Sequence, residues 1–298
     1  MMSEEQQFLN DYSFLKELEM KGEMKLMVGT ALLGMSMSAN AAIIDLFTTD
    51  QAELSDGTVG GGGVSSSVSS GLGDILTGVG DAAGERDLFV ELLDNDGVPT
   101  REATIGVAGG VLDFSVDSLA AGTGTVQWDG LDGSIALDPD GLGGVDLTAG
   151  GTLSGFGVTT LFSDAGYEFL VGAYTDATHW TEISFSASAV NSATTSFIPF
   201  SGFTNPFLCG AVNPAPGVNS ITCSDAVGAP GGTQVVDFTN LGALEFVIDP
   251  NGGSTSIDLT LDQITTIPEP SVLGLMGAGL LAGGLVARRN KKNKAASA

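Results

Sequence analysis

Residues that could carry out catalysis are scarce in this sequence. His179 is the only histidine, so a Ser-His-Asp arrangement or an imidazole acid–base step would depend on it alone. The chain has no Gly-x-Ser-x-Gly, Gly-x-x-x-x-Gly-Lys or His-Glu-x-x-His motif. Acids are so numerous that carboxylate pairs of the kind glycosidases use must arise by chance. We therefore expect no enzymatic activity, with a secreted hydrolase as the least favoured alternative.

Cys209 and Cys223 are the only cysteines, and they flank a stretch rich in Pro, Gly and Asn. In an exported protein, an oxidising compartment favours their pairing. Closing a loop of about 15 residues stabilises a fold by about 3 kcal/mol in the chain-entropy treatment. The spacing differs from Cys-x-x-Cys and no histidine lies nearby in sequence, so a disulfide is favoured over a redox or metal site.

Two short Asp-rich stretches offer the hard oxygen ligands that calcium prefers. Asp94 and Asp96 lie in one stretch and Asp138 and Asp140 in the other, each just before a glycine. Neither stretch completes an EF-hand loop. These four aspartates are candidate calcium ligands, and plain Asp-Gly hairpin turns are the alternative. No other cofactor is expected.

Trp128 and Trp180 are the only tryptophans. Trp128 precedes Asp129 and Trp180 follows His179, so each ring has a polar neighbour. Both are candidate sugar contacts, as in lectin-like sandwiches that stack a sugar ring on a tryptophan. The alternative is that each ring covers the core, because large aromatic side chains contribute much of the buried area.

The elements that would position these residues are β-strands. Apolar and polar residues alternate in three runs, at residues 112–117, 244–249 and 257–262. Alternation places one face of each strand in a core and leaves the other face wet and acidic. Further candidate strands cover residues 87–93, 125–129, 157–162, 167–173, 180–190 and 234–238.

Asp-Gly and Asn-Gly pairs separate many of these runs, as tight turns require. Strands at intervals of about ten residues predict an antiparallel β-sandwich or jelly roll. Residues 57–73 are rich in Gly, Ser and Val, which predicts a flexible loop or a poorly packed edge. We therefore expect one all-β domain over residues 42–266.

The charge of this domain excludes one class of partner. Residues 43–267 hold two basic residues, Arg86 and Arg101, against 29 Asp and Glu. Binding to DNA, RNA or an anionic membrane surface depends on Lys and Arg, so nucleic acid is excluded as a partner. The acidity favours solubility and attracts cations such as calcium, and the alternative is a merely solvating surface.

Residues 24–41 predict a signal-peptide helix. Lys25 supplies the positive region, residues 26–37 the apolar region, and Ala39-Asn40-Ala41 a small-residue cleavage site. We predict cleavage after Ala41. Residues 1–23 are acidic and unlike an export leader, so we expect translation to begin at Met24; a genuine N-terminal extension is the alternative.

The end of the chain predicts a single transmembrane helix. Residues 271–287 are apolar, Gly-rich and uncharged. As a helix they would span about 25 Å, slightly less than the hydrocarbon layer of about 30 Å. A basic tail at residues 288–294 should stay cytoplasmic and leave the body outside; it holds Arg288, Arg289, Lys291, Lys292 and Lys294.

Pro268, Glu269 and Pro270 stand directly before this helix. The order of Pro-Glu-Pro, short apolar helix and basic tail over residues 267–294 resembles the PEP-CTERM sorting signal of exported bacterial proteins. The resemblance implies that the three residues are recognised by exosortase, a membrane protease-transpeptidase that removes the helix. It also implies a Gram-negative bacterium that makes exopolysaccharide. A simple membrane anchor is the alternative.

The resemblance implies a protein anchored in the inner membrane as a precursor and then sorted to the cell surface or extracellular matrix. We expect a structural or adhesive component associated with exopolysaccharide or biofilm. A carbohydrate-binding module is the main alternative.

Overall fold

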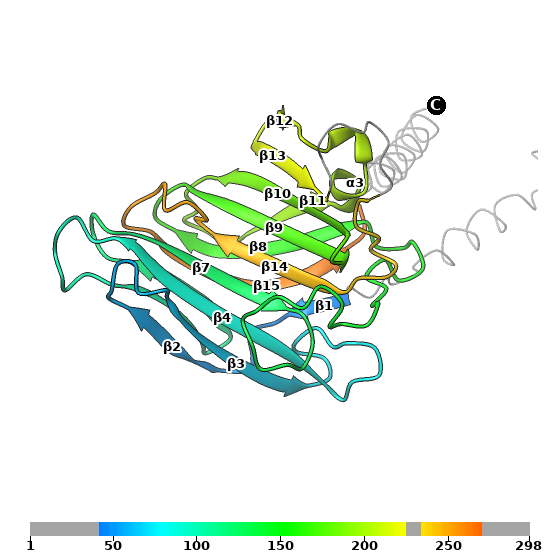
Figure 1. Ribbon diagram of the computed structural model, residues 1–298, viewed down its shortest axis with the longest axis horizontal. Coiled ribbons are helices and arrows are strands. Elements are labelled where there is room, and N and C mark those ends of the chain that lie inside the picture. The colour runs from blue at the N-terminus through cyan, green and yellow to red at the C-terminus, as the bar shows by residue number, and fades with distance from the viewer. Residues whose placement is uncertain (1–41, 225–233, 270–298) are drawn as a thin grey trace, which may run out of the picture. The chain divides into compact units, whose positions relative to one another are not determined.

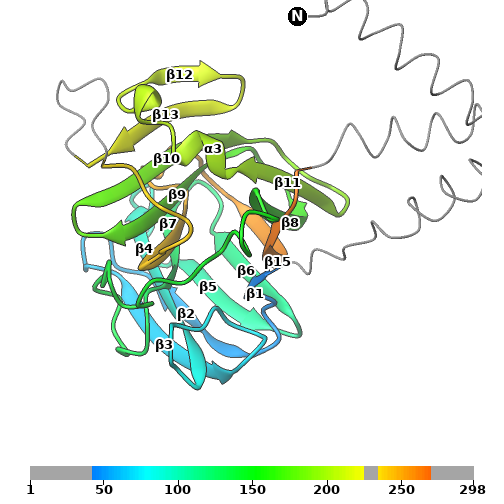
Figure 2. The same ribbon diagram turned by 90° about the vertical axis from the view of Figure 1, so that its right-hand side faces the viewer.

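Two antiparallel β-sheets that pack face to face form the body of the protein (Figures 1 and 2). The structure is a computed structural model, and it describes residues 42–224 and 234–269. It confirms the predicted all-β sandwich. The predicted signal peptide, transmembrane helix and basic tail lie outside the described residues.

The first sheet has seven strands in the order β11-β8-β15-β6-β5-β2, with β1 also paired to β15. Its members are β1 (Ala42–Asp45), β2 (Gln51–Asp56), β5 (Ala103–Ala108), β6 (Val111–Val116), β8 (Gly155–Ser163), β11 (Thr194–Pro199) and β15 (Asp258–Ile267). The last strand of the body thus lies inside this sheet, between β8 and β6.

The second sheet has eight strands in the order β12-β13-β10-β9-β14-β7-β4-β3. Its members are β3 (Val64–Gly71), β4 (Ala83–Asp94), β7 (Ala121–Trp128), β9 (Tyr167–Asp176), β10 (His179–Ala187), β12 (Val212–Ala215), β13 (Val218–Cys223) and β14 (Ala243–Ile248). Two short helical turns, α3 (Phe200–Phe203) and η1 (Pro206–Leu208), connect β11 to β12.

The alternating runs lie where the pattern predicts. Leu112, Phe114 and Val116 of β6 are buried while Asp113 between them is exposed. In the runs at 244–249 and 257–262, the core-facing residues are buried in the same core: Leu244, Phe246, Ile248, Ile257, Leu259 and Leu261. Phe156 lies among four phenylalanines, all edge-on to its ring: Phe200, Phe203, Phe238 and Phe246. Burial of these faces between the sheets drives the sandwich to close.

Two sequence predictions need correction. For residues 57–73 the sequence predicts a flexible loop or a poorly packed edge, and the edge alternative fits Val64–Gly71, which form β3, the exposed edge strand beside β4, rather than a loop. Pairing with β4 supplies the backbone hydrogen bonds that these Ser-rich residues could not specify by apolar pattern. Conversely, residues 234–238 form no strand; Val236 and Phe238 reach the core from a connecting segment instead.

A buried ion pair joins the two sheets. Arg86 on β4 donates from Nη1 to both carboxylate oxygens of Asp45 on β1, at 2.9 and 3.1 Å, and neither side chain is exposed. Trp128 on β7 donates from Nε1 to Asp45 Oδ2 at 2.9 Å. Arg86 also donates to Gln51 Oε1 at 2.9 Å and to the Thr49 carbonyl at 2.6 Å. Both charges therefore have several partners in the core.

Burial raises the pKa of Asp45 to about 6, although Arg86 beside it favours the ionised form. In the core, Asp45 depends on Arg86 for its counter-charge. A buried charge that loses its partner destabilises a fold far more than an exposed one does.

Replacing Arg86 with Met should lower the free energy of unfolding by about 3–5 kcal/mol, because Asp45 would stay buried without its cation. Urea unfolding of the exported protein, followed by tryptophan fluorescence, measures this loss. Arg101→Met is the control, since it removes an exposed pair with Asp96 and should cost at most about 1 kcal/mol. Equal losses in the two variants would contradict this view of the core.

Candidate functional site

The sorting residues begin where the sheet ends. Ile267 is the last residue of β15, and its carbonyl accepts a hydrogen bond from the Ser154 amide at 3.1 Å. Pro268 and Glu269 follow at once and are exposed, while Pro270 lies outside the described residues. No stalk therefore separates the body from the Pro-Glu-Pro motif.

The start of the body lies beside its end. Ala42, the first residue of β1, is the register partner of Thr266 on β15, and its amide donates to the Thr266 hydroxyl at 3.2 Å. The cleavage predicted after Ala41 would thus create an N-terminus next to the sorting motif. Both ends leave the sandwich at the same place.

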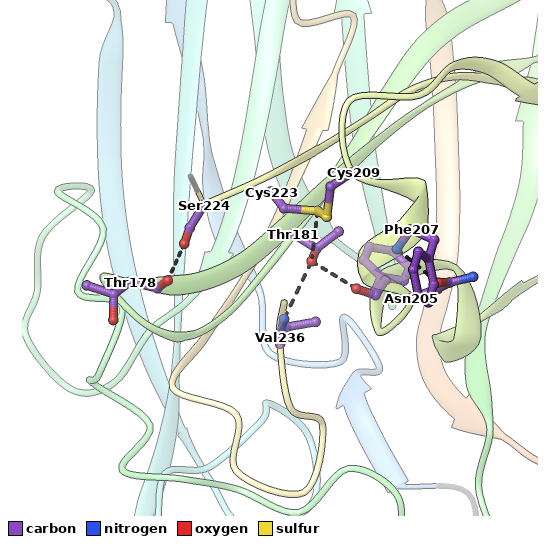
Figure 3. Close-up of a disulfide and its surroundings, with 9 residues drawn as sticks. Thr178, Thr181, Asn205, Phe207, Cys209, Cys223, Ser224 and Val236 are labelled. Carbon is purple, nitrogen blue, oxygen red and sulfur yellow. Dashed lines mark hydrogen bonds between the residues drawn. A yellow bond between two sulfur atoms is a disulfide. The ribbon is translucent and has the colours of Figure 1, made fainter. Parts of the chain in front are cut away.

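The predicted disulfide between Cys209 and Cys223 is present, with a sulfur–sulfur distance of 2.05 Å. It ties the segment after η1 to β13 (Figure 3). Beside it, the buried Thr181 hydroxyl donates to the Phe203 carbonyl at 2.9 Å and accepts from the Val236 amide at 3.5 Å. The disulfide therefore closes a segment that is also fixed to the sheet through Thr181.

The two tryptophans have different environments. Trp128 is fully buried and packs edge-on against Phe246, so the prediction that it contacts sugar is wrong; its indole reaches Asp45 in the core instead. Trp180 on β10 is partly exposed. Its ring lies 6.2 Å from that of Tyr174 on β9, tilted by 35°. Of the two rings, only Trp180 stays a candidate sugar contact.

A polar row crosses the outer face of the eight-stranded sheet, which is the face opposite the core. The row crosses β4, β7, β14, β9 and β10 in that order. Its members are register partners on successive strands: Asp87, Gln127, Glu245, Gly172 and Glu182. Gln127 donates from Nε2 to Glu245 Oε2 at 2.6 Å. Burial raises the pKa of Glu245. The row therefore concentrates carboxylates on a partly covered surface.

The ring of Tyr174 lies over Gly172 in this row. A Cβ on Gly172 would come within 3.0 Å of the ring, so glycine leaves the room that the ring needs. The Tyr174 hydroxyl donates to Glu182 Oε1 at 2.8 Å, and burial raises the pKa of Tyr174. Trp180, Tyr174 and Glu182 thus form an aromatic and acidic patch on the outer face.

The predicted calcium ligands do not converge on one point. Asp94 is the last residue of β4 and Asp96 lies in the turn that follows, where it pairs with Arg101 at 3.1 Å. Asp138 and Asp140 lie in the long connection between β7 and β8, and all four residues are exposed. None belongs to a group of three metal-binding side chains in the described part of the chain. Calcium binding at these aspartates stays a prediction.

A different acidic cluster does converge. Glu85 and Asp87 on β4 and Asp132 after β7 have carboxylate oxygens within 4.8 Å of one another. Burial raises the pKa of Asp87 to about 7 and that of the neighbouring Asp129 to about 6. Sequence analysis missed this group, although Glu85 and Asp87 share one strand face. The cluster arises only when β4 pairs with β7.

The only histidine, His179, is the first residue of β10 and directly follows the turn from β9. His179 Nδ1 lies 2.9 Å from Asp176 Oδ2 and 3.1 Å from the Thr178 hydroxyl. Hydrogen bonds from Thr178 and then His179 lower the pKa of Asp176. These contacts close the β9–β10 hairpin, and such Asx contacts are typical of turns.

A shallow cavity of about 520 Å³ lies beside Glu269. Its wall includes Leu153, Phe200 and Thr204. Its other acid, Asp146, accepts hydrogen bonds from the amides of Thr148 and Gly150 within its own turn. The cavity therefore offers no convergent set of free reactive groups among its lining residues.

The fold and these features define an all-β sandwich whose C-terminal strand leads directly into a Pro-Glu-Pro sequence. The family profile of the PEP-CTERM protein-sorting motif matches residues 266–292. The chain is therefore a PEP-CTERM sorting-domain protein, which implies export, a membrane-anchored precursor and exosortase processing. No helix in residues 42–224 and 234–269 is long and apolar enough to cross a membrane.

No curated protein matches the sequence. Among solved structures, the chain is similar to the family 11 carbohydrate-binding module of a cellulosomal cellulase of Clostridium thermocellum, with 15% identity, a TM-score of 0.35, and coverage of 77% of this chain and 95% of that one. A family 11 module from the same organism, in complex with a β-1,3-1,4-mixed-linked tetrasaccharide, gives 12% identity, a TM-score of 0.31, and coverage of 76% and 95%. These low values say nothing about ligands of this chain.

Replacing both Cys209 and Cys223 with Ala should lower the free energy of unfolding by about 3 kcal/mol, because the unfolded chain regains the freedom of a loop of about 15 residues. Urea unfolding with and without reducing agent measures the loss. Reducing agent should destabilise the wild type and leave the double variant unchanged. A wild type that reacts with maleimide when unfolded without reductant would contradict the disulfide.

Proposed function

We propose that this protein is a structural or adhesive component of the cell surface or extracellular matrix, and that it acts without catalysis. The observation that carries the proposal is the direct passage from β15 into the sorting motif. Exosortase processing would release a folded domain that is complete up to its last strand. The mature protein outside the cell would then be the sandwich domain itself.

The properties of the body suit this role. It carries 29 acids against two basic residues, so copies repel one another and stay soluble until cations screen or bridge them. The disulfide closes the segment between η1 and β13 against unfolding outside the cell. Exopolysaccharide is the matrix partner we propose, in keeping with the sorting route.

Replacing Pro268, Glu269 and Pro270 with Ala should leave the protein uncleaved in the membrane fraction, because exosortase would lose its recognition site. Fractionation and intact-mass measurement detect this change. Asp262→Ala is the control, since Asp262 lies on β15 outside the matched residues 266–292. Normal release of the triple variant from the membrane fraction would contradict the proposed processing.

Carbohydrate binding is the second candidate function, and the patch of Trp180, Tyr174 and Glu182 favours it. A partly exposed indole gives a flat apolar surface, and the neighbouring carboxylate can accept hydrogen bonds from sugar hydroxyls. A secreted hydrolase, acting through carboxylates, is a weaker third candidate.

A pull-down with the exopolysaccharide of the producing bacterium separates the first two candidates. If the matrix role needs no sugar site, Trp180→Ala should bind as the wild type does. If the patch binds sugar, this variant should lose at least about tenfold in affinity, equivalent to roughly 1.4 kcal/mol. Phe207→Ala is the matched control, because Phe207 is a 77% exposed aromatic residue on η1 and is not one of the three patch residues.

A further inference from the structure

Buried oxygen atoms without hydrogen bonds gather at one place on the outer face. Five buried side-chain polar atoms lack a hydrogen-bond partner within residues 42–224 and 234–269. Four of them are Asp87 Oδ1, Asp87 Oδ2, Asp129 Oδ1 and Gln127 Oε1. Unsatisfied buried polar atoms are costly and rare in folded proteins. Their concentration on three neighbouring residues therefore calls for a ligand.

The pairing of β4 with β7 builds this arrangement. Asp87 and Gln127 are register partners, and partners on one sheet face have Cβ atoms about 5 Å apart. Glu85 lies two residues before Asp87 and Asp129 two residues after Gln127, so all four point to the same face. The two adjacent strands thus present a compact block of oxygen atoms.

The connection after β7 folds back over this block. Glu85 Oε1 accepts hydrogen bonds from the amides of Asp132 and Gly133, at 3.0 and 2.6 Å. Asp129 Oδ2 accepts from the Asp138 amide at 2.8 Å. These contacts bring the Asp132 carboxylate next to Glu85 and Asp87. Asp87 and Asp129 are thereby buried, each with 0% exposure.

No protein cation neutralises the cluster among the described residues. Arg86, between Glu85 and Asp87 in sequence, points to the opposite face and pairs with Asp45. Arg101 pairs with Asp96. Ser67 and Asp129 lie close enough to Asp87 to influence its pKa, but Ser67 forms no hydrogen bond of standard geometry with it. The carboxylates therefore face one another without a counter-charge.

We propose that Glu85, Asp87, Asp129 and Asp132 bind one calcium ion, with Gln127 Oε1 as a further ligand. Carboxylate and amide oxygens are the ligands of hard cations, and calcium accepts six to eight of them in irregular geometry. Magnesium fits less well, because it needs a near-octahedral site and gives up its water reluctantly. The ion would neutralise the buried carboxylates and satisfy the four oxygens.

This site would fasten the connection between β7 and β8 to the sheet. Glu85 and Asp87 belong to β4, whereas Asp129 and Asp132 belong to the connection. An ion bound by residues of both β4 and the connection would link these two segments, so calcium should stabilise the folded protein. The competing account is a proton shared by Asp87 and Asp129, which would require no metal.

Calcium titration of the exported protein, first treated with EDTA, tests the proposal. Calcium sites of extracellular modules have dissociation constants of about 10⁻⁴–10⁻³ M, so about 10 mM calcium chloride should raise the melting temperature by roughly 3–10 °C. Magnesium chloride at the same concentration should raise it less. Isothermal titration calorimetry should give one calcium per chain.

Asp87→Asn and Asp129→Asn should each abolish this response, whereas Asp113→Asn should keep it. Asp113 is an exposed acid on β6 of the other sheet and lies outside the cluster. In EDTA, Asp87→Asn should melt at or above the wild type, because it removes an unpaired buried charge; this shows that the variant folds. An absent calcium response in the wild type, or one that survives in both Asn variants, would overturn the proposal and favour the shared proton.

Discussion

The contact between Arg86 and Asp45 is the constraint on which the rest of the sandwich depends. It joins a strand of each sheet inside the core, and Trp128 and Gln51 complete it from two more strands. Buried ion pairs add little net stability, but each charge requires the other. The pairing of Arg86 with Asp45 therefore favours the one arrangement of the two sheets in which β1 lies across from β4 and β7.

Strand β4, which carries Arg86, also explains the chemistry of the outer face of the eight-stranded sheet. Because side chains alternate along β4, the inward position of Arg86 forces Glu85 and Asp87 outward. Arg86 pairs with Asp45 in the core, so it supplies no counter-charge to Glu85 and Asp87 on the outer face. In a body with 29 acids and two basic residues, such a surplus must be solvated, protonated or matched by ions from outside.

Local patterns were enough to predict part of this structure. The strand at residues 112–117 alternates strictly, and the Cys209–Cys223 pair follows from export and spacing. Trp128 could not be placed, because its partner Asp45 is 83 residues away. Strand β3 has little apolar signal, since its pairing with β4 is mostly a backbone effect. The acidic cluster likewise depends on strand register, which no local pattern specifies.

The ends of the chain connect this fold to its destination. Ala42 and Thr266 are neighbours, so both predicted processing events would trim the sandwich at one place. Mass spectrometry of the mature protein tests this most directly. We predict a chain that begins at Ala42, lacks the helix at residues 271–287, and keeps the Cys209–Cys223 disulfide. An untrimmed chain in the soluble cytosolic fraction, with two reduced cysteines, would contradict the account.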